Sequence, residues 1–369
     1  MNRLFRWDQM GLFLLALAAG ILPFAVPEVC AAALREGLTL CSGPLLLSLF
    51  PFLVVSRLLI QCPESDLLAL PFRLAAWGIG IRTPCAARVL CIGFLGGFAP
   101  AASAAAQAVR TGQLTAEEAD ALLPACICSG PSFVVLTVGQ SLLGSAELGV
   151  LLFAAQITAN YLTAALLNRF AGVRSVKPGS AAQASPAPPR LDEILADAAI
   201  TYCKLCGFIL FFRMLAAGAG ALLPAGAGTL CAILLEVCSG CDLASRTGRW
   251  GSLLCCAALS VQGLSVLLQV RTICPPEMTL RPLYRARMLH LPLSLALFYL
   301  LLPGGEADVF STLPVRVLLM RRVPPDCALL VFAVCCMAAC TLRSGIRQVE
   351  QKQMARNAGG CCINSKTLL

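Results

Sequence analysis

The sequence predicts an all-α fold: a polytopic transmembrane helix bundle with two related halves and re-entrant helical hairpins. The first observation is composition, because 58% of the 369 residues are hydrophobic and only 13% are charged. Soluble domains average about 25% charged residues. The second observation is that the charged residues leave long uncharged windows between them. Backbone groups in lipid must be hydrogen-bonded within the segment, so such windows predict helices.

Nine windows without Asp, Glu, Lys or Arg follow one another along the chain. They lie between residues 8–28, 36–57, 88–110, 120–147, 147–169, 213–236, 249–271, 287–306 and 326–343. Most reach the roughly 20 residues that cross about 30 Å of hydrocarbon. The first lacks a small-residue cleavage site, so we expect a retained first helix rather than a signal peptide.

A Pro-, Ala- and Ser-rich segment, residues 171–192, predicts a solvated linker between two transmembrane halves, 1–170 and 193–302. A polar loop and a last transmembrane helix are expected over 303–342, and a flexible tail over 343–369. The net charge of +9 comes largely from basic residues in loops and ends. It therefore indicates orientation in a membrane and contact with membrane lipid, and no nucleic-acid partner.

The two halves have a parallel layout. In the first half we expect helices over about 38–60 and 148–168, with interrupted windows over about 85–108 and 121–143. In the second half we expect helices over about 198–222 and 288–302, a window ending at 236–240 and a helix running through 262–265. Interrupted segments in corresponding positions of two halves indicate a transporter site. The alternative is that Gly, Ala and Pro serve close packing of membrane helices.

Two segments of the first half place glycine beside proline inside an uncharged window. Their candidate solute-binding residues are Gly97, Phe98, Pro100, Ser129, Gly130, Pro131 and Ser132. A helix break frees backbone groups, which are tolerated at membrane depth only against protein or a water-filled cavity. Because Pro131 has no N–H, a nearby carbonyl is left free. The alternatives are a kinked packing helix and serine hydroxyls that cap the backbone.

Glu236 follows a long apolar run and is the candidate for coupling to a proton or cation. A carboxylate at membrane depth is costly unless it is paired or neutral. Ser239 and Gly240 are candidate binding residues beside it. The alternative is an interfacial position, close to Asp242 and Arg246.

A polar stripe is expected on one helix face, because Gln262, Ser265 and Gln269 recur at i, i+3 and i+7. Gln156 and Asn160 form a similar pair. The alternative is hydrogen bonding between helices, worth roughly 1 kcal/mol for each residue. His290 is expected at the membrane interface.

The 21 cysteines lie mostly in apolar windows, where cysteine behaves as a small hydrophobic residue. Two C-x-x-C pairs, Cys203/Cys206 and Cys238/Cys241, are present beside a single histidine. Structural zinc sites take about four ligands. No catalytic triad or phosphate-binding loop is visible either. We therefore expect no cofactor, no metal and no enzymatic activity.

Several short stretches, in order, resemble the sporulation integral membrane protein YlbJ (SpoVV) family of the nucleoside-recognition gate-domain group. They are Leu49–Phe52, Gly112–Asp120 leading into Ser129–Phe133, Leu234–Gly240, Gly263–Val266 with Gln269, and Pro282–His290. The resemblance covers roughly residues 38–292. It departs at Gly97–Ala102, where the family shows G-Y-P-x-G-A and this chain has a displaced proline and lacks the second glycine.

The resemblance implies transport of dipicolinate, a small aromatic dianion, across the outer forespore membrane of a sporulating bacterium. Helix N-termini, serine hydroxyls and glutamine amides suit its carboxylates, whereas Glu236 repels it unless protonated, cation-bound or turned away. The competing interpretation is a non-transporting membrane scaffold in spore-envelope assembly. A transporter requires one shared cavity for five residues: Ser129, Ser132, Glu236, Gln262 and Gln269.

Overall fold

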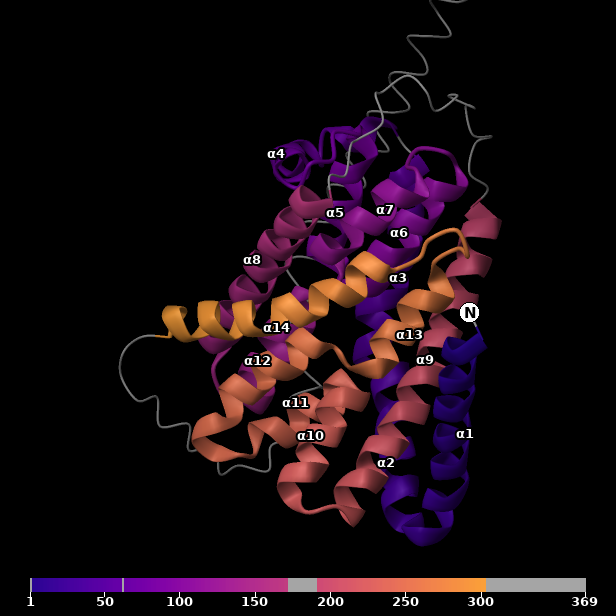
Figure 1. Cartoon of the computed structure of the whole chain (residues 1–369), viewed down its shortest axis with the longest axis vertical. Helices are drawn as coiled ribbons and strands as arrows, with labels where there is room; N and C mark the ends of the chain where they lie inside the picture. The colour runs from indigo at the N-terminus through magenta and orange to yellow at the C-terminus, as the bar shows by residue number, and fades with distance from the viewer. Residues whose placement is uncertain (1, 62, 172–190, 303–369) are drawn as a thin grey trace, which may run out of the picture.

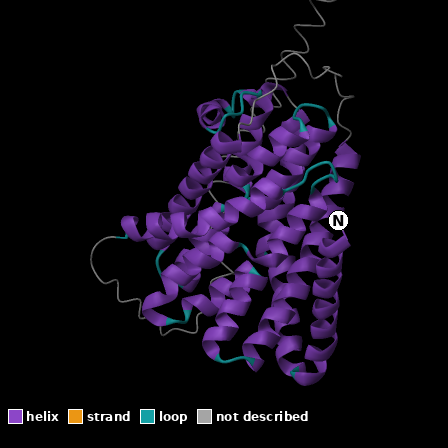
Figure 2. Cartoon of the chain, in the orientation of Figure 1, coloured by secondary structure: helices purple, strands orange, loops and turns teal. Residues whose placement is uncertain are grey.

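The computed structural model describes residues 2–61, 63–171 and 191–302 (Figure 1). Every regular element in these ranges is a helix, and none of them is a strand (Figure 2). The all-α prediction is confirmed for this part of the chain. Most of the predicted linker, the predicted last helix and the predicted tail lie outside the described residues.

The elements before the linker are mostly short helices joined by tight turns. They are α1 (Asn2–Ala25), α2 (Pro27–Ser42), α3 (Pro44–Gln61), a 3₁₀ turn (Pro63–Asp66), α4 (Leu70–Gly78), α5 (Pro84–Gly96), α6 (Phe98–Arg110), α7 (Ala116–Cys126), the π-helix η2 (Ser132–Leu142) and α8 (Ala146–Ala171). The helix predicted over 38–60 is therefore wrong in its start. Gly43 leaves helical geometry, and the chain divides there into α2 and α3.

The elements after the linker begin with the longest helix that the structure describes. They are α9 (Leu191–Leu222), α10 (Ala225–Leu235), α11 (Val237–Ser245), a 3₁₀ turn (Gly248–Trp250), α12 (Gly251–Val261), α13 (Gly263–Ile273) and α14 (Arg281–Leu301). In Figure 1, α1, α2 and α9 run side by side along one edge, and α14 crosses the middle of the bundle.

Four helical stretches of the described chain are long and apolar enough to cross a membrane. They are Pro27–Gln61, Ala146–Ala171, Leu191–Leu222 and Gly248–Ile273. The outer surface is also apolar, since Phe24 is 88% and Phe170 84% exposed. Both observations are consistent with an integral membrane protein, because lipid rather than water would cover such side chains.

The core lies between α5, α6, α7 and α8 on one side and α11, α12 and α14 on the other. Helix α6 enters it with alanines at positions 99, 101, 102, 104, 105, 106 and 108, all of them buried. Small side chains allow membrane helices to approach closely. This packing brings several helix ends together in the middle of the molecule.

Candidate functional site

Four helix breaks meet in the interior of the bundle. The chain leaves helical geometry at Gly97 between α5 and α6, at 127–130 between α7 and η2, at Glu236 between α10 and α11, and at Gln262 between α12 and α13. Helices α5 and α6 fold back against each other, and so do α10 and α11. The first two breaks fall on the segments in which the sequence predicted interruptions, and the third falls on the predicted coupling residue Glu236.

The breaks touch in two pairs, backbone against backbone. Gly97 has φ +81°, and a Cβ added to it would lie 2.7 Å from the backbone nitrogen of Gly130. Gly263 has φ +70°, and a Cβ there would lie 2.9 Å from the backbone nitrogen of Glu236. Only glycine, which has no Cβ, can adopt a positive φ without strain and also fit this close to the neighbouring backbone. Each half of the chain therefore contributes one pair of crossing breaks.

Ile127 follows the last residue of α7 and adopts extended backbone, so its carbonyl takes part in no helix. Three side chains donate to this oxygen instead. Arg287 bonds it through Nη2, Asn160 through Nδ2 at 3.3 Å and Gln262 through Nε2 at 3.4 Å. This carbonyl is therefore a junction between α8, α14 and the α12–α13 break.

Glu236 is 2% exposed, so it lies inside the bundle and not at its surface. Its carboxylate caps the helix that it precedes, accepting hydrogen bonds from the Cys238 and Ser239 backbone N–H groups at 2.8 and 2.7 Å. The Ser239 hydroxyl donates to it at 2.8 Å. Free N–H groups and the helix dipole both stabilise a negative charge at this end of α11.

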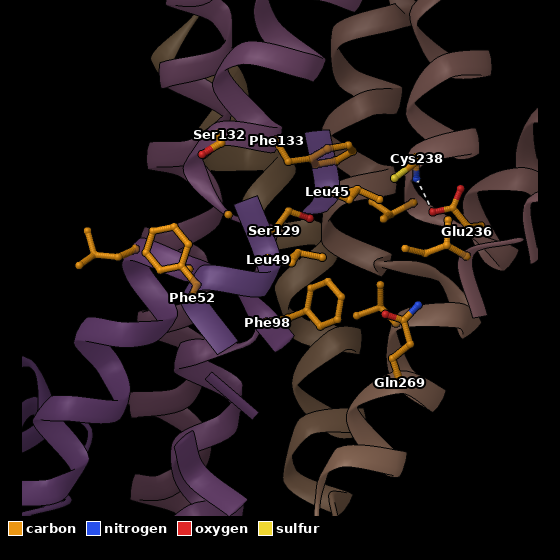
Figure 3. A pocket seen from close by; sticks show the side chains of 16 residues that line it. Leu45, Leu49, Phe52, Phe98, Ser129, Ser132, Phe133, Glu236, Cys238 and Gln269 are labelled. Atoms are coloured by element: carbon orange, nitrogen blue, oxygen red, sulfur yellow. Dashed lines mark hydrogen bonds between the residues drawn. The ribbon is translucent and has the colours of Figure 1, made fainter. Parts of the chain in front are cut away.

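A small cavity of about 70 Å³ lies between the two pairs of breaks (Figure 3). Six of the predicted site residues line it: Phe98, Ser129, Gly130, Ser132, Glu236 and Gln269. Figure 3 shows the serines on one side of this space and Glu236 with Gln269 on the other. Four of the five residues required to share a cavity therefore do so, and Gln262 is the exception.

The other predicted site residues are placed around this cavity without lining it: Gly97, Pro100, Pro131, Ser239, Gly240, Gln262 and Ser265. Two of them serve packing inside a folded-back pair of helices. Pro100 lies against Gly96, and a Cβ on Gly240 would lie 2.8 Å from the Ile233 Cα. Close packing, the alternative weighed from the sequence, thus accounts for these two positions.

The predicted continuous polar stripe is wrong at Gln262. This residue adopts φ 62° and separates α12 from α13, so it shares no helix face with Ser265 and Gln269. Those two do share a face, and the Gln269 Nε2 donates to the Ser265 Oγ at 2.9 Å. Gln262 instead points to the Ile127 carbonyl.

Apolar walls of the cavity come from helices in which the sequence analysis predicted no site residue. Leu45, Leu49 and Phe52 of α3 and Ile209 of α9 line it. These residues look like ordinary membrane-span residues, because their role depends only on which helices pack beside the breaks.

A buried polar cluster lies next to the cavity on α8, α12 and α14. His290 is 1% exposed and its Nε2 lies 3.2 Å from the Gln156 carbonyl, so the predicted interfacial position is wrong. The Gln156 Nε2 donates to the Ser260 Oγ at 2.9 Å. His290 is the tenth residue of α14, which begins at Arg281, and it is one of the residues that this helix buries.

Arg287 is the residue that the sequence analysis missed. It is 7% exposed, its Nε has no hydrogen-bond partner, and it forms no salt bridge with any carboxylate of the described residues. An ionisable side chain inside a membrane bundle is by default a candidate functional residue. In the sequence it only marked the edge of an uncharged window.

The fold and the site define a helical bundle of the membrane class with a small cavity between paired helix breaks. No family model, no curated protein and no solved structure matches this chain. The functional conclusion therefore rests on the geometry of the breaks and on the groups that line the cavity.

Proposed function

We propose that this protein is a membrane transporter whose solute passes between the two pairs of helix breaks. The observation that carries this proposal is the cavity, which broken helices from both halves of the chain line together. Irregular backbone at membrane depth is tolerated where it is buried in protein or lines a cavity. Solute sites of secondary transporters form between interrupted helices of two structural repeats.

Two related halves are part of this proposal. The first half has the folded-back pair α5–α6 followed by the interrupted helix α7–η2, and the second has α10–α11 followed by α12–α13. We interpret α5–α6 and α10–α11 as re-entrant hairpins with tips at Gly97 and Glu236. The same order of elements and the matching glycine contacts at the breaks support a common origin of the two halves.

The solute that we propose is a small anion, and the YlbJ family resemblance favours dipicolinate during sporulation. Among the cavity-lining residues Glu236 is the only Asp, Glu, Lys, Arg or His. An anion beside this carboxylate needs a neutralising partner. We therefore assign to Glu236 the binding of a coupling proton or cation that accompanies the solute. Arg287 donates a hydrogen bond to the Ile127 carbonyl and so places a positive charge at the α7–η2 break, without lining the cavity itself.

The size of the cavity adds a mechanical requirement. Its 70 Å³ holds about five waters at roughly 15 Å³ each, whereas sites for drug-sized ligands occupy about 300–1,000 Å³. An aromatic dianion enters only if the two pairs of breaks separate. The structure then corresponds to a closed state in the proposed transport cycle.

The test is uptake of labelled dipicolinate into vesicles reconstituted with the full chain. We expect uptake above that of empty vesicles and a dependence on the proton or cation gradient. Glu236→Gln should remove this dependence, whereas Glu147→Gln, a change at an exposed carboxylate outside the cavity, should preserve it. Uptake equal to that of empty vesicles would refute transport of this solute and favour the scaffold. Unchanged gradient dependence in Glu236→Gln would refute the coupling role.

A further inference from the structure

A second cavity, polar and of about 150 Å³, lies where α3, α6, α9 and α13 pack together. Arg57 lies four residues before the end of α3, Arg110 ends α6, and Thr272 is one residue from the end of α13. Lys204 comes from the first half of α9. The cavity shares no lining residue with the one between the breaks. It therefore lies at an end of the bundle, where membrane helices meet water.

The charges of this second cavity are unbalanced. Three cations, Arg57, Arg110 and Lys204, face one carboxylate, Asp197, for a net charge of +2. Asp197 is held by Arg57, with 2.5 Å between its Oδ2 and the Arg57 Nη1. Arg110 and Lys204 form no salt bridge with any described residue, and both are exposed. Two cations thus remain available for an anion that enters from outside.

Arg57 is fixed in place, unlike the two free cations. It is 8% exposed, its Nε donates to the Ser103 Oγ at 3.3 Å, and its Nη2 donates to the Thr201 Oγ1 at 3.5 Å. A guanidinium held in this way presents a planar set of donors, which suits phosphate oxygens. The cavity therefore combines one preorganised cation with two adaptable ones.

Apolar surface adjoins this cationic cavity. Ile200 lines it and is 55% exposed. A free inorganic anion gains no affinity from apolar surface. A phospholipid does, because its acyl chains can cover that surface while its phosphate binds the cations. Basic pockets between membrane helices recognise anionic lipid headgroups in this way.

We propose that the Arg57–Arg110–Lys204 cavity binds the phosphate-bearing headgroup of an anionic phospholipid, with the acyl chains along the face of α9 that carries Ile200. This role is independent of transport through the break cavity. Arg110 and Lys204 set the preference for a net negative headgroup, and Arg57 orients the phosphate.

The test compares the affinity of the purified full chain, in neutral detergent, for short-chain phosphatidylglycerol and short-chain phosphatidylcholine. Both lipids carry a phosphate diester, but only the first is net negative. Each Lys or Arg near an anionic surface is worth about fivefold in affinity. The double variant Arg110→Gln/Lys204→Gln should therefore bind phosphatidylglycerol about thirty-fold more weakly and lose its preference over phosphatidylcholine.

The matched control is Arg246→Gln/Arg249→Gln, which removes the same charge from exposed positions between α11 and α12. It should keep wild-type affinity. The proposal is overturned if the wild type shows no preference between the lipids, or if both double variants lose affinity equally. Displacement of the lipid by millimolar inorganic phosphate at equal strength would also overturn it, because the site would then be one for free phosphate.

Discussion

Replacing Gly97 with alanine tests the contact between the first two helix breaks. Gly97 has φ +81° and ψ −164°, a region that is essentially restricted to glycine. Forcing another residue into such backbone costs about 1–3 kcal/mol. The added Cβ would also lie 2.7 Å from the Gly130 nitrogen and 3.0 Å from its Cα. Backbone atoms cannot move aside as a flexible side chain can, and overpacking of this kind costs a further 1–3 kcal/mol or so. We expect Gly97→Ala to be destabilised by about 2–6 kcal/mol.

Alanine substitutions at two other glycines serve as controls that separate the backbone strain at Gly97 from its steric clash with Gly130. Gly112 has φ +68° with nothing within 4 Å of a built Cβ, so Gly112→Ala should cost only about 1–2 kcal/mol for its left-handed backbone. Gly207 lies inside helix α9 with equally open space, and Gly207→Ala should stabilise by about 0.5–1 kcal/mol. The measurement is the free energy of unfolding from denaturant titrations in mixed micelles, followed by helical circular dichroism. If Gly97→Ala proves no less stable than Gly112→Ala, the two breaks do not touch.

One further substitution addresses the junction at the Ile127 carbonyl. Arg287→Met removes an interior charge that has no carboxylate partner among the described residues. Replacing buried charges by apolar groups is often neutral or stabilising. We therefore expect a change in unfolding free energy within about 1 kcal/mol and a fall in uptake, whereas a loss above about 3 kcal/mol would show that the charge is paired.

The sequence predicted the two breaks of the first half because their causes are local: glycine lies beside proline at 97–100 and 130–131. At Glu236 it predicted a functional carboxylate but no break. The fourth break has no such signal. Gln262 takes a left-handed conformation that is unfavourable for most side chains, in a segment whose polar spacing favoured a continuous helix. Tertiary contacts stabilise this left-handed conformation: Gly263 packs on the Glu236 backbone, and the Gln262 amide donates to the Ile127 carbonyl.

Charged residues marked the ends of the predicted spans, and three of these markers besides Glu236 are buried and bonded to distant parts of the chain. Arg57 pairs with Asp197, 140 residues away in sequence. Asp120 accepts hydrogen bonds from the Thr279 N–H at 2.8 Å and the Leu280 N–H at 3.1 Å, and so fixes the turn that precedes α14. Arg287 bonds a carbonyl 160 residues away. Because each partner is distant in sequence, hydropathy windows place such residues at the membrane surface.

The break between α12 and α13 lies between the Glu236 backbone and the carbonyl that Arg287 binds. Gly263 lies so close to the Glu236 nitrogen that no Cβ fits between them. The adjacent Gln262 donates to the same carbonyl oxygen as Arg287. Glu236 and Arg287 form no salt bridge with each other, so this two-residue segment is a direct structural connection between them. A displacement of the Glu236 backbone toward Gly263 must move Gly263 and, with it, the Gln262 amide.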